Sequence, residues 1–285
     1  MQLPPDWQVT PMAVAALALG ITHEVGLVRL SERQTPVDRW RTRRRSLAFY
    51  AALFTLVLVA SGPLERWGMK WLSIHMVVHV VEMFYLPPLL IVGAPWVPLL
   101  FALPVQQRRW LLRKWYLVRS TRCLRKLWGL VSSPFSAVVL FNGVMVLWHV
   151  PAVFNFASWH DWAMEWLMAP SFVVSGVLFW RVLVSSHPWG PKGSLLQQAL
   201  AVVVTGFEML VLAMALGIFT KDPWYSMNVA LLGRVDALRD QRLAAGILWV
   251  CGDFWAVPSL VLIGYRLYRQ RGGLSVSFER ALGRA

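Results

Sequence analysis

Long apolar stretches recur along the chain, and they constrain the fold more than any other feature of the sequence. Each stretch approaches the roughly 20 apolar residues that a helix needs to cross a bilayer. Because no water is available in lipid, the backbone polar groups must be satisfied within each segment, which favours helices. The sequence therefore predicts an all-α, polytopic transmembrane helix bundle of about seven spans, with residues 1–285 forming a single integral membrane domain. The predicted spans lie at about 12–30, 46–63, 71–92, 135–154, 162–183, 195–219 and 243–265.

The low content of charged residues also indicates that lipid is the solvent. Only 15% of the residues are charged and 57% are hydrophobic, whereas a soluble domain carries about 25% charged residues. The formal net charge of +14 would suit a nucleic-acid partner, but cytoplasmic loops of membrane proteins concentrate basic residues in the same way. We therefore expect membrane lipid, and no nucleic acid, as a partner. The opening segment MQLPPDWQVTP lacks the basic region of a cleaved signal peptide, so the first apolar stretch is expected to remain as a helix.

Basic residues are distributed unevenly between alternate loops. Residues 31–45 contain six Arg, residues 106–133 contain eight Lys plus Arg, and the residues after Tyr265 contain five. The loops between them contain two (Arg66 and Lys70), none (151–161) and four (221–242). The positive-inside rule then predicts an outer N-terminus and a cytoplasmic C-terminus, in a multi-pass protein of the cell inner (plasma) membrane. Loop 185–194, which carries Lys192 alone, is the inner loop that departs from this rule.

Three shorter features are expected near the inner face. Residues 108–130 alternate basic and apolar side chains, which predicts an amphipathic helix on the anionic inner leaflet. Residues 96–104 are apolar but too few to cross the membrane. Pro87-Pro88 is expected to break the third span near its inner end, since proline cannot donate to the helix hydrogen-bond ladder.

Four of the six histidines fall on the predicted outer side. His75 and His79 lie about one and two turns into the third span, and their spacing of four residues puts both imidazoles on one helix face. His149 lies near the outer end of the fourth span, and His160 lies at the start of the fifth. Polar residues inside a membrane are functional candidates, and neutral imidazole is a ligand for copper, zinc, iron and nickel.

Methionines accompany these histidines, and thioethers favour Cu(I). Met76 follows the first histidine directly, and Met164 lies four residues after His160. The pattern predicts a copper site that opens to the outside. The alternative is that each histidine makes a hydrogen bond between helices and each methionine fills space. The candidate metal ligands are His75, His79, His149, His160, Met76 and Met164.

Carboxylates also enter the predicted spans, at Glu82, Glu165, Glu208 and Asp253. Glu82 lies three residues after His79, so it is expected either to orient that imidazole or to make a hydrogen bond between helices. Glu165, five residues after His160, is a second carboxylate expected beside the ligands. His23, beside Glu24 in the first span, and His187, in a predicted inner loop, are left outside the site.

Several sequence motifs, taken in order, resemble those of a known family. His75-Met-Val-Val-His79 is followed by Pro87-Pro88-Leu89-Leu90-Ile-Val-Gly93-Ala-Pro95. Three further motifs are Trp148-His149-Val150-Pro151, Gly176-Val-Leu-Phe-Trp180 and Asp240-Gln241 with Ala245-Gly246-Ile-Leu-Trp249. A fourth segment, Asp222-Pro223-Trp224-Tyr225, precedes an outer loop. Together, on a frame of seven spans, they resemble the CtaG family of multi-span cytochrome c oxidase assembly factors, from the first span to about residue 265.

The resemblance implies a role in maturing a haem–copper oxidase of the respiratory chain, connected with the supply of copper to subunits of that cytochrome c oxidase. The chain departs from the pattern of the family at one position. The family commonly carries a second histidine about four residues after the histidine at the start of the fifth span. Met164 stands at that place here, which keeps a ligand for Cu(I) but makes a poor one for zinc or Cu(II). Either the site is a softer His/Met copper site, or this chain has partly lost it.

Three other functions stay open beside a metallochaperone-like assembly factor. A haem-binding membrane cytochrome needs two axial histidines on facing helices, for example His75 or His79 with His149. A copper or proton-coupled transporter needs polar groups across the whole membrane, and the inner half offers only His23, Glu24 and a few acids. A purely structural subunit would tolerate loss of the outer histidines. No nucleophile–base arrangement, phosphate-binding glycine loop or zinc-hydrolase motif is present in the sequence, so we expect no enzymatic activity.

Overall fold

The computed structural model describes residues 9–118 and 121–270, and within these ranges every extended regular element is helical. The side chain of Asp253, one of the carboxylates predicted to enter a span, lies outside the description. The elements are α1 (Pro11–Ser31), α2 (Pro36–Ser61), α3 (Pro63–Lys70), α4 (Leu72–Val80), η1 (Val81–Tyr85), α5 (Leu86–Gly93), α6 (Trp96–Ala102), α7 (Val105–Leu117), α8 (Arg122–Val131), α9 (Pro134–His149), α10 (Pro151–Ser158), α11 (Asp161–Ala163), η3 (Met164–Met168), α12 (Ala169–Leu183), α13 (Leu195–Gly217), α14 (Ser226–Leu232) and α15 (Arg234–Gln270).

Six helices among the described residues are long and apolar enough to cross a membrane. A seventh candidate is the pair α8 and α9, which is bent by 68°. The prediction of an all-helical, polytopic protein with about seven spans is therefore confirmed. The six are Pro11–Ser31, Pro36–Ser61, Leu72–Gly93, Asp161–Leu183, Leu195–Gly217 and Arg234–Arg269.

Proline and capping residues set where several spans begin. Pro11, Pro36 and Pro134 occupy the first helical positions of α1, α2 and α9, where the missing amide hydrogen would have no partner in the helix anyway. The hydroxyl of the preceding Thr or Ser accepts a hydrogen bond from the first turn in each case. Helix α13 begins with a reciprocal capping box between Ser194 and Gln197.

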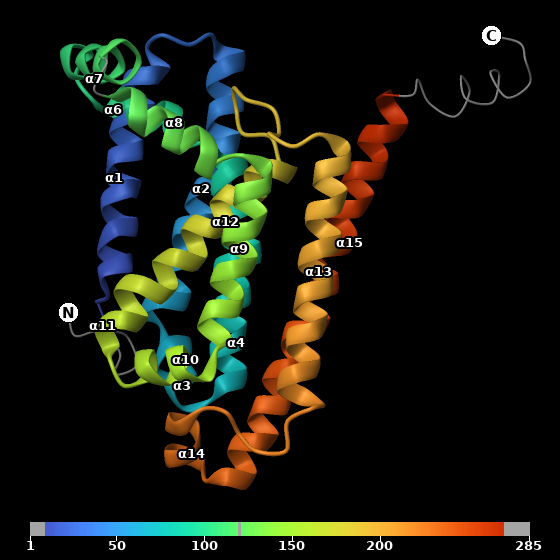
Figure 1. Cartoon of the computed structure of the whole chain (residues 1–285). Helices are drawn as coiled ribbons and strands as arrows, with labels where there is room; N and C mark the ends of the chain where they lie inside the picture. The colour runs from blue at the N-terminus through green and yellow to red at the C-terminus, as the bar shows by residue number, and fades with distance from the viewer. Residues whose placement is uncertain (1–8, 119–120, 271–285) are drawn as a thin grey trace, which may run out of the picture.

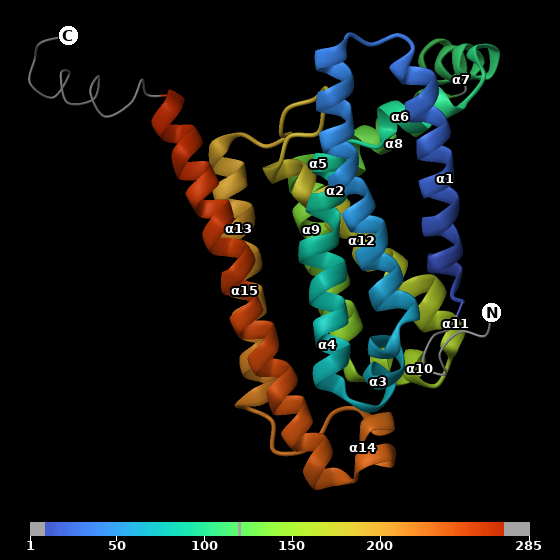
Figure 2. The same ribbon diagram turned by 180° about the vertical axis from the view of Figure 1, so that it is seen from behind.

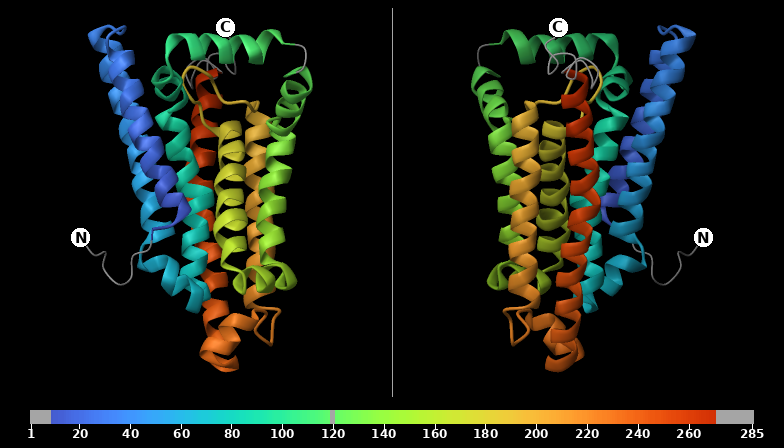
Figure 3. Two further views of the ribbon diagram at one scale, coloured as in Figure 1. Left: turned by 90° about the vertical axis from the view of Figure 1, so that its left-hand side faces the viewer. Right: turned by 90° about the vertical axis from the view of Figure 1, so that its right-hand side faces the viewer.

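The spans form a bundle with two outlying pairs (Figure 1, Figure 2). The pair α1 and α2 packs on one side of the bundle and the pair α13 and α15 packs on the other, with the α4–α5 span, α9 and α12 between them. Figure 3 shows α1 and α2 leaning away from the other spans. Helices α6, α7 and α8 gather at one end of the bundle. Helices α3, α10, α11 and α14 gather at the opposite end, where α4 begins. The main core between the spans is aromatic, with Phe84, Phe141, Phe179 and Trp255 in ring contact.

The third span does not break at Pro87-Pro88, contrary to expectation. The chain stays helical from Leu72 to Gly93, and one wide π-helical turn, η1, precedes the prolines. The carbonyl of Met83 would accept from residue 87 in an α-helix or from residue 88 in a π-helix, and neither proline has an amide hydrogen. The indole Nε1 of Trp180 donates to this carbonyl at 3.1 Å instead. A neighbouring helix therefore supplies the hydrogen bond whose absence was expected to end the span.

The basic segment 108–130 also differs from its prediction as one amphipathic helix. It divides into α7 and α8, on either side of residues 119–120, which lie outside the described ranges. No side chain of either helix is fully buried, as expected for helices at a membrane surface. The short segment α6 lies against α1, and the carbonyl of Pro98 approaches Gly26 so closely that a Cβ there would clash with it.

Candidate metal centre

His75, His79 and Glu82 form a line of hydrogen bonds along one face of the third span. The Nδ1 of His79 lies 3.3 Å from the Oε2 of Glu82, and its Nε2 lies 2.6 Å from the Nε2 of His75. When the Nδ1–H of His79 donates to Glu82, its Nε2 is left to accept from the Nε2–H of His75. The line runs from a carboxylate that is 1% exposed to an imidazole that is only partly buried. Glu82 thus forms a hydrogen bond with His79, the contact required by one of the two roles that the sequence left open for this carboxylate.

His149 approaches this pair from the end of α9. It lies within electrostatic range of both His75 and His79. Its Nδ1 donates to the carbonyl of Met145 at 2.7 Å, which fixes the ring and leaves Nε2 as the nitrogen available to a ligand. The backbone carbonyl of His149 accepts from the hydroxyl of Tyr225 at 3.1 Å, so the helix end before Pro151 is held by a residue from the segment before α14.

Aromatic side chains enclose the histidines. The ring of His75 meets Phe154 edge-on at 5.2 Å between centroids, and the ring of His79 lies 4.4 Å from that of Phe172. Phe154 in turn lies 4.4 Å from Tyr225. These rings cover His79 and part of His75, and polar interactions are stronger where water is excluded.

Both helices that flank the site carry a π-helical turn. The turn η1 begins two residues after His79, and η3 begins at Met164 in the fifth span; α12, which continues the fifth span after η3, packs against η1. Such turns are rare and often occur at functional sites, because the extra residue changes which face the following side chains occupy. Sequence periodicity did not reveal either turn.

Carboxylates converge on the same end of the bundle. Glu65 of α3 lies within electrostatic range of Glu82 and of Glu165. Burial, and then the nearby Glu165, raises the pKa of Glu65 to about 7. Glu65 was not among the residues singled out from the sequence. Its position between two spans, on the predicted outer side, was the signal that could have identified it.

A further set of hydrogen bonds fastens the beginning of α4. The carboxylate of Asp240, in α15, accepts from the backbone amide of Leu72 at 2.5 Å and from the hydroxyl of Ser73 at 2.5 Å. The seventh span therefore caps the helix that carries His75 and His79. The next residue, Gln241, accepts from the amide of Trp224 and donates to the carbonyl of Leu216.

His160 lies apart from the other predicted ligands. It is exposed, its Nδ1 donates to the carbonyl of Phe156 at 2.7 Å, and its ring stacks on Phe156. Among the described residues no hydrogen bond or ring contact joins it to the other three histidines. Met76 and Met164 are both buried in the main core. His23 lies between α1 and α2, where its Nδ1 contacts the hydroxyl of Tyr50, and His187 is exposed in the loop before α13.

The arrangement of the histidines and carboxylates tests whether a metal ion fits this cluster. Within the described residues, no set of three or more His, Cys, Asp or Glu side chains is arranged to hold a metal ion as it stands. The two Nε2 atoms at 2.6 Å are closer than the roughly 3.3 Å that separates two nitrogen ligands of one tetrahedral metal. Neutral imidazole is a ligand for copper, zinc, iron and nickel alike, and a carboxylate hydrogen-bonded to the ring orients it.

These features define a polytopic helical membrane protein with a cluster of imidazoles and carboxylates buried at the end of the bundle opposite the basic helices α7 and α8. The chain belongs to the family of cytochrome c oxidase caa3 assembly factors, whose pattern matches residues 23–270.

Curated relatives of the chain come from mycobacteria. The chain is 24% identical over 281 residues to an uncharacterized protein of Mycobacterium leprae, with 94% of this chain and 40% of that protein covered. It is 25% identical over 275 residues to uncharacterized proteins of Mycobacterium bovis and Mycobacterium tuberculosis, covering 91% of this chain and 39% of each. The chain thus spans about two fifths of the length of these relatives. No solved structure matches it.

Proposed function

We propose that the protein is a non-enzymatic assembly factor that holds copper transiently and passes it to a subunit of a cytochrome c oxidase. Family membership supports the connection with the oxidase. The cluster of His75, His79 and His149, buried beside Glu82, is the observation that supports a role in copper handling. Copper is the cargo in this proposal, so a site that is incomplete without a partner or without rearrangement suits transfer better than permanent storage.

The hydrogen bonds support a proposed role for each side chain. His79 would bind through Nε2 while Glu82 holds its Nδ1–H, an arrangement that fixes the tautomer and raises the basicity of the ligand nitrogen. His149 would bind through Nε2 because its Nδ1 is already engaged with Met145. Glu65, whose pKa is raised to about 7, would lose its proton more readily when a cation binds, so Glu65 and Glu165 would favour a cation without direct contact. The remaining predicted ligands are His160, Met164 and Met76. They would then serve at the entrance of the copper site or in packing around it.

The proposed orientation places this cluster on the outer side of the plasma membrane. The basic helices α7 and α8 lie at the opposite end of the bundle, and basic segments are retained in the cytoplasm. Copper would therefore be delivered at the outer face. Of the alternatives, a haem site would need axial histidines on two facing helices, such as His149 with His75 or His79, but the Nε2 atoms of His75 and His79 are engaged with each other. A transporter would need a continuous polar path, and the polar groups of the other half, His23, Glu24 and Tyr50, lie between α1 and α2.

The proposal is tested by the Cu(I) content and affinity of the detergent-purified chain. We expect the wild type to bind about one copper and the His75→Ala/His79→Ala variant to bind none. Glu82→Gln should weaken binding by roughly 10- to 100-fold, because His79 loses the carboxylate that orients it.

His187→Ala removes an exposed imidazole from a loop outside the cluster and serves as the control. It should leave copper binding unchanged, while a native circular dichroism spectrum confirms that each variant is folded. Equal copper binding by the wild type and the His75→Ala/His79→Ala variant would show that these residues do not hold copper.

A further inference from the structure

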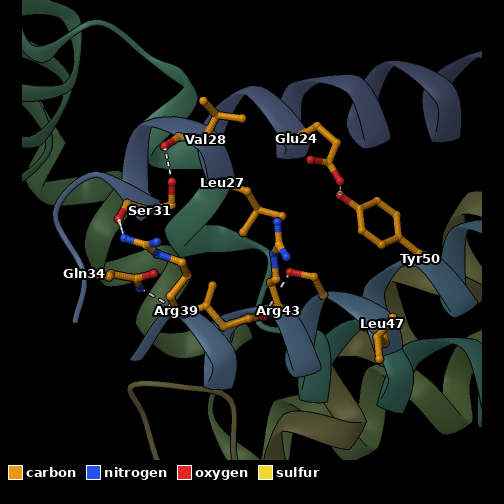
Figure 4. A pocket seen from close by; sticks show the side chains of 11 residues that line it. Glu24, Leu27, Val28, Ser31, Gln34, Arg39, Arg43, Leu47 and Tyr50 are labelled. Atoms are coloured by element: carbon orange, nitrogen blue, oxygen red, sulfur yellow. Dashed lines mark hydrogen bonds between the residues drawn. The ribbon is translucent and has the colours of Figure 1, made fainter. Parts of the chain in front are cut away.

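A polar pocket lies between α1 and α2, close to the turn that joins them and at the same end of the bundle as α7 and α8 (Figure 4). It has a volume of about 300 Å³, within the range of sites for small ligands. It is separate from the histidine cluster, which lies at the other end of the bundle. The lining residues that matter here are Ser31, Gln34, Arg39, Thr42, Arg43 and Val28.

Two arginines give the pocket its charge. Both extend from α2 toward α1, and Figure 4 shows their guanidinium groups between the two helices. Arg39 donates through Nη2 to the carbonyl of Ser31 at 2.9 Å, which holds its side chain across the pocket. Arg43 makes no ion pair or hydrogen bond with any described residue. A guanidinium group fixed at a pocket wall and a second without a partner form a site with unused donors for an oxyanion.

The one carboxylate in the lining is already engaged. Glu24 accepts from the hydroxyl of Tyr50 at 2.7 Å, and the same hydroxyl lies 2.8 Å from the Nδ1 of His23. Figure 4 shows Glu24 and Tyr50 together at one end of the pocket, with Ser31, Gln34 and Arg39 at the other. An anion entering beside Arg39 would therefore meet guanidinium groups, with the carboxylate at the other end of the pocket.

We propose that this pocket binds the phosphate of an anionic phospholipid headgroup. Apolar side chains continue from the polar end of the pocket onto the surface of the spans: Val28 is 61% exposed and Leu47 69% exposed. A ligand with a phosphate joined to acyl chains matches this change from basic to apolar lining, whereas a free phosphate uses only the basic part. Pockets of basic residues between spanning helices recognise lipid headgroups in this way.

The site has a physical consequence for the bundle. Helices α1 and α2 are joined by the short turn after Ser31, and α1 has few buried residues (Ala16, His23, Gly26 and Leu30). A headgroup bridging Ser31 and Arg43 would add a further contact between these two helices at the end where Arg39 and Gln34 already join them. This role is independent of copper binding at the opposite end.

The experiment measures lipid binding to the full chain in detergent by native mass spectrometry, with phosphatidylglycerol, phosphatidylcholine and inorganic phosphate as probes. We expect wild-type protein to retain phosphatidylglycerol in preference to phosphatidylcholine. The Arg39→Gln/Arg43→Gln variant should bind phosphatidylglycerol about 30-fold more weakly, the loss expected when two arginines at about 1 kcal/mol each are removed.

The matched control is Arg41→Gln/Arg44→Gln, which removes the same charge from the same helix at residues outside the pocket lining. It should bind phosphatidylglycerol like the wild type. Arg39→Lys/Arg43→Lys keeps the charge without the forked donors and should be intermediate, which also guards against a variant that fails to fold.

Equal loss in the Arg41/Arg44 control would show that charge alone attracts the lipid, and the proposed site would be wrong. Competition by inorganic phosphate at the same concentration as the lipid would show that the pocket takes a soluble anion, which also overturns the proposal.

Discussion

Asp240 shows how one side chain can position a site to which it does not belong. Its carboxylate is 5% exposed and caps the first turn of α4 from α15, a helix 167 residues away in sequence. Helix α4 begins after Trp71 with no capping side chain of its own, so the amides of Leu72 and Ser73 depend on this carboxylate. His75 lies in the turn that Asp240 holds.

Replacing Asp240 with alanine should destabilise the protein by roughly 2 kcal/mol, because a buried cap with a charged acceptor is lost. Hydrogen exchange should become faster in the peptide covering residues 72–80. The control is Asp236→Ala, four residues earlier in α15, where the carboxylate forms only an exposed ion pair with Arg239. That change should stay within about 0.5 kcal/mol. Equal exchange in α4 for both variants would contradict the capping role.

At the scale of the elements, the contact between α12 and the third span depends on a glycine. A Cβ at Gly176 would lie 2.6 Å from the Cγ of Pro87 and 3.0 Å from the carbonyl of Met83. The small residue lets α12 approach closely enough for Trp180 to donate to that same carbonyl. The close approach, the π-helical turn and the two prolines therefore form one structural unit next to His79.

The same substitution at two glycines should have opposite effects. Gly176→Ala should destabilise the protein by about 1–3 kcal/mol, because the new methyl group overlaps Pro87. Gly143→Ala, in α9, adds its methyl group where no atom lies within 4 Å, so it should be neutral or stabilising by up to about 1 kcal/mol. Thermal unfolding in detergent measures both. A loss of stability for Gly143→Ala as large as that for Gly176→Ala would show that close packing at Gly176 is not the cause.

At the scale of the whole molecule, the two ends of the bundle differ in chemistry. One end carries α7 and α8 and the pocket lined by Arg39 and Arg43; the other carries the histidine cluster and the acidic residues Glu65 and Glu82. This polarity favours a single orientation in the membrane, with the basic end in the cytoplasm.

Labelling with a membrane-impermeant maleimide tests that orientation. Cys123, in α8, is exposed, and a Cys251→Ala variant leaves it as the one thiol. We expect no labelling of Cys123 in intact cells and full labelling after lysis. A cysteine placed at Asp236, at the other end of the bundle, in a Cys123→Ser/Cys251→Ala background should be labelled in intact cells. The reverse pattern would invert the proposed topology and place the histidine cluster inside.

Sequence by itself determined the class of fold and part of the site. Spans are specified locally, because each must bury some 20 residues of backbone in lipid with its own hydrogen bonds; the pairing of His75 with His79, and of His79 with Glu82, follows from helical periodicity within one span. Only the tertiary structure decided which helices meet. The packing of the helices brought His149 to this pair, left His160 exposed and added Glu65 to the cluster. It also placed Trp180 where its hydrogen bond keeps the third span helical past the two prolines. Asp240 reaches the start of α4 across 167 residues. Such contacts depend on how the helices pack, and no periodicity within a single segment encodes that arrangement.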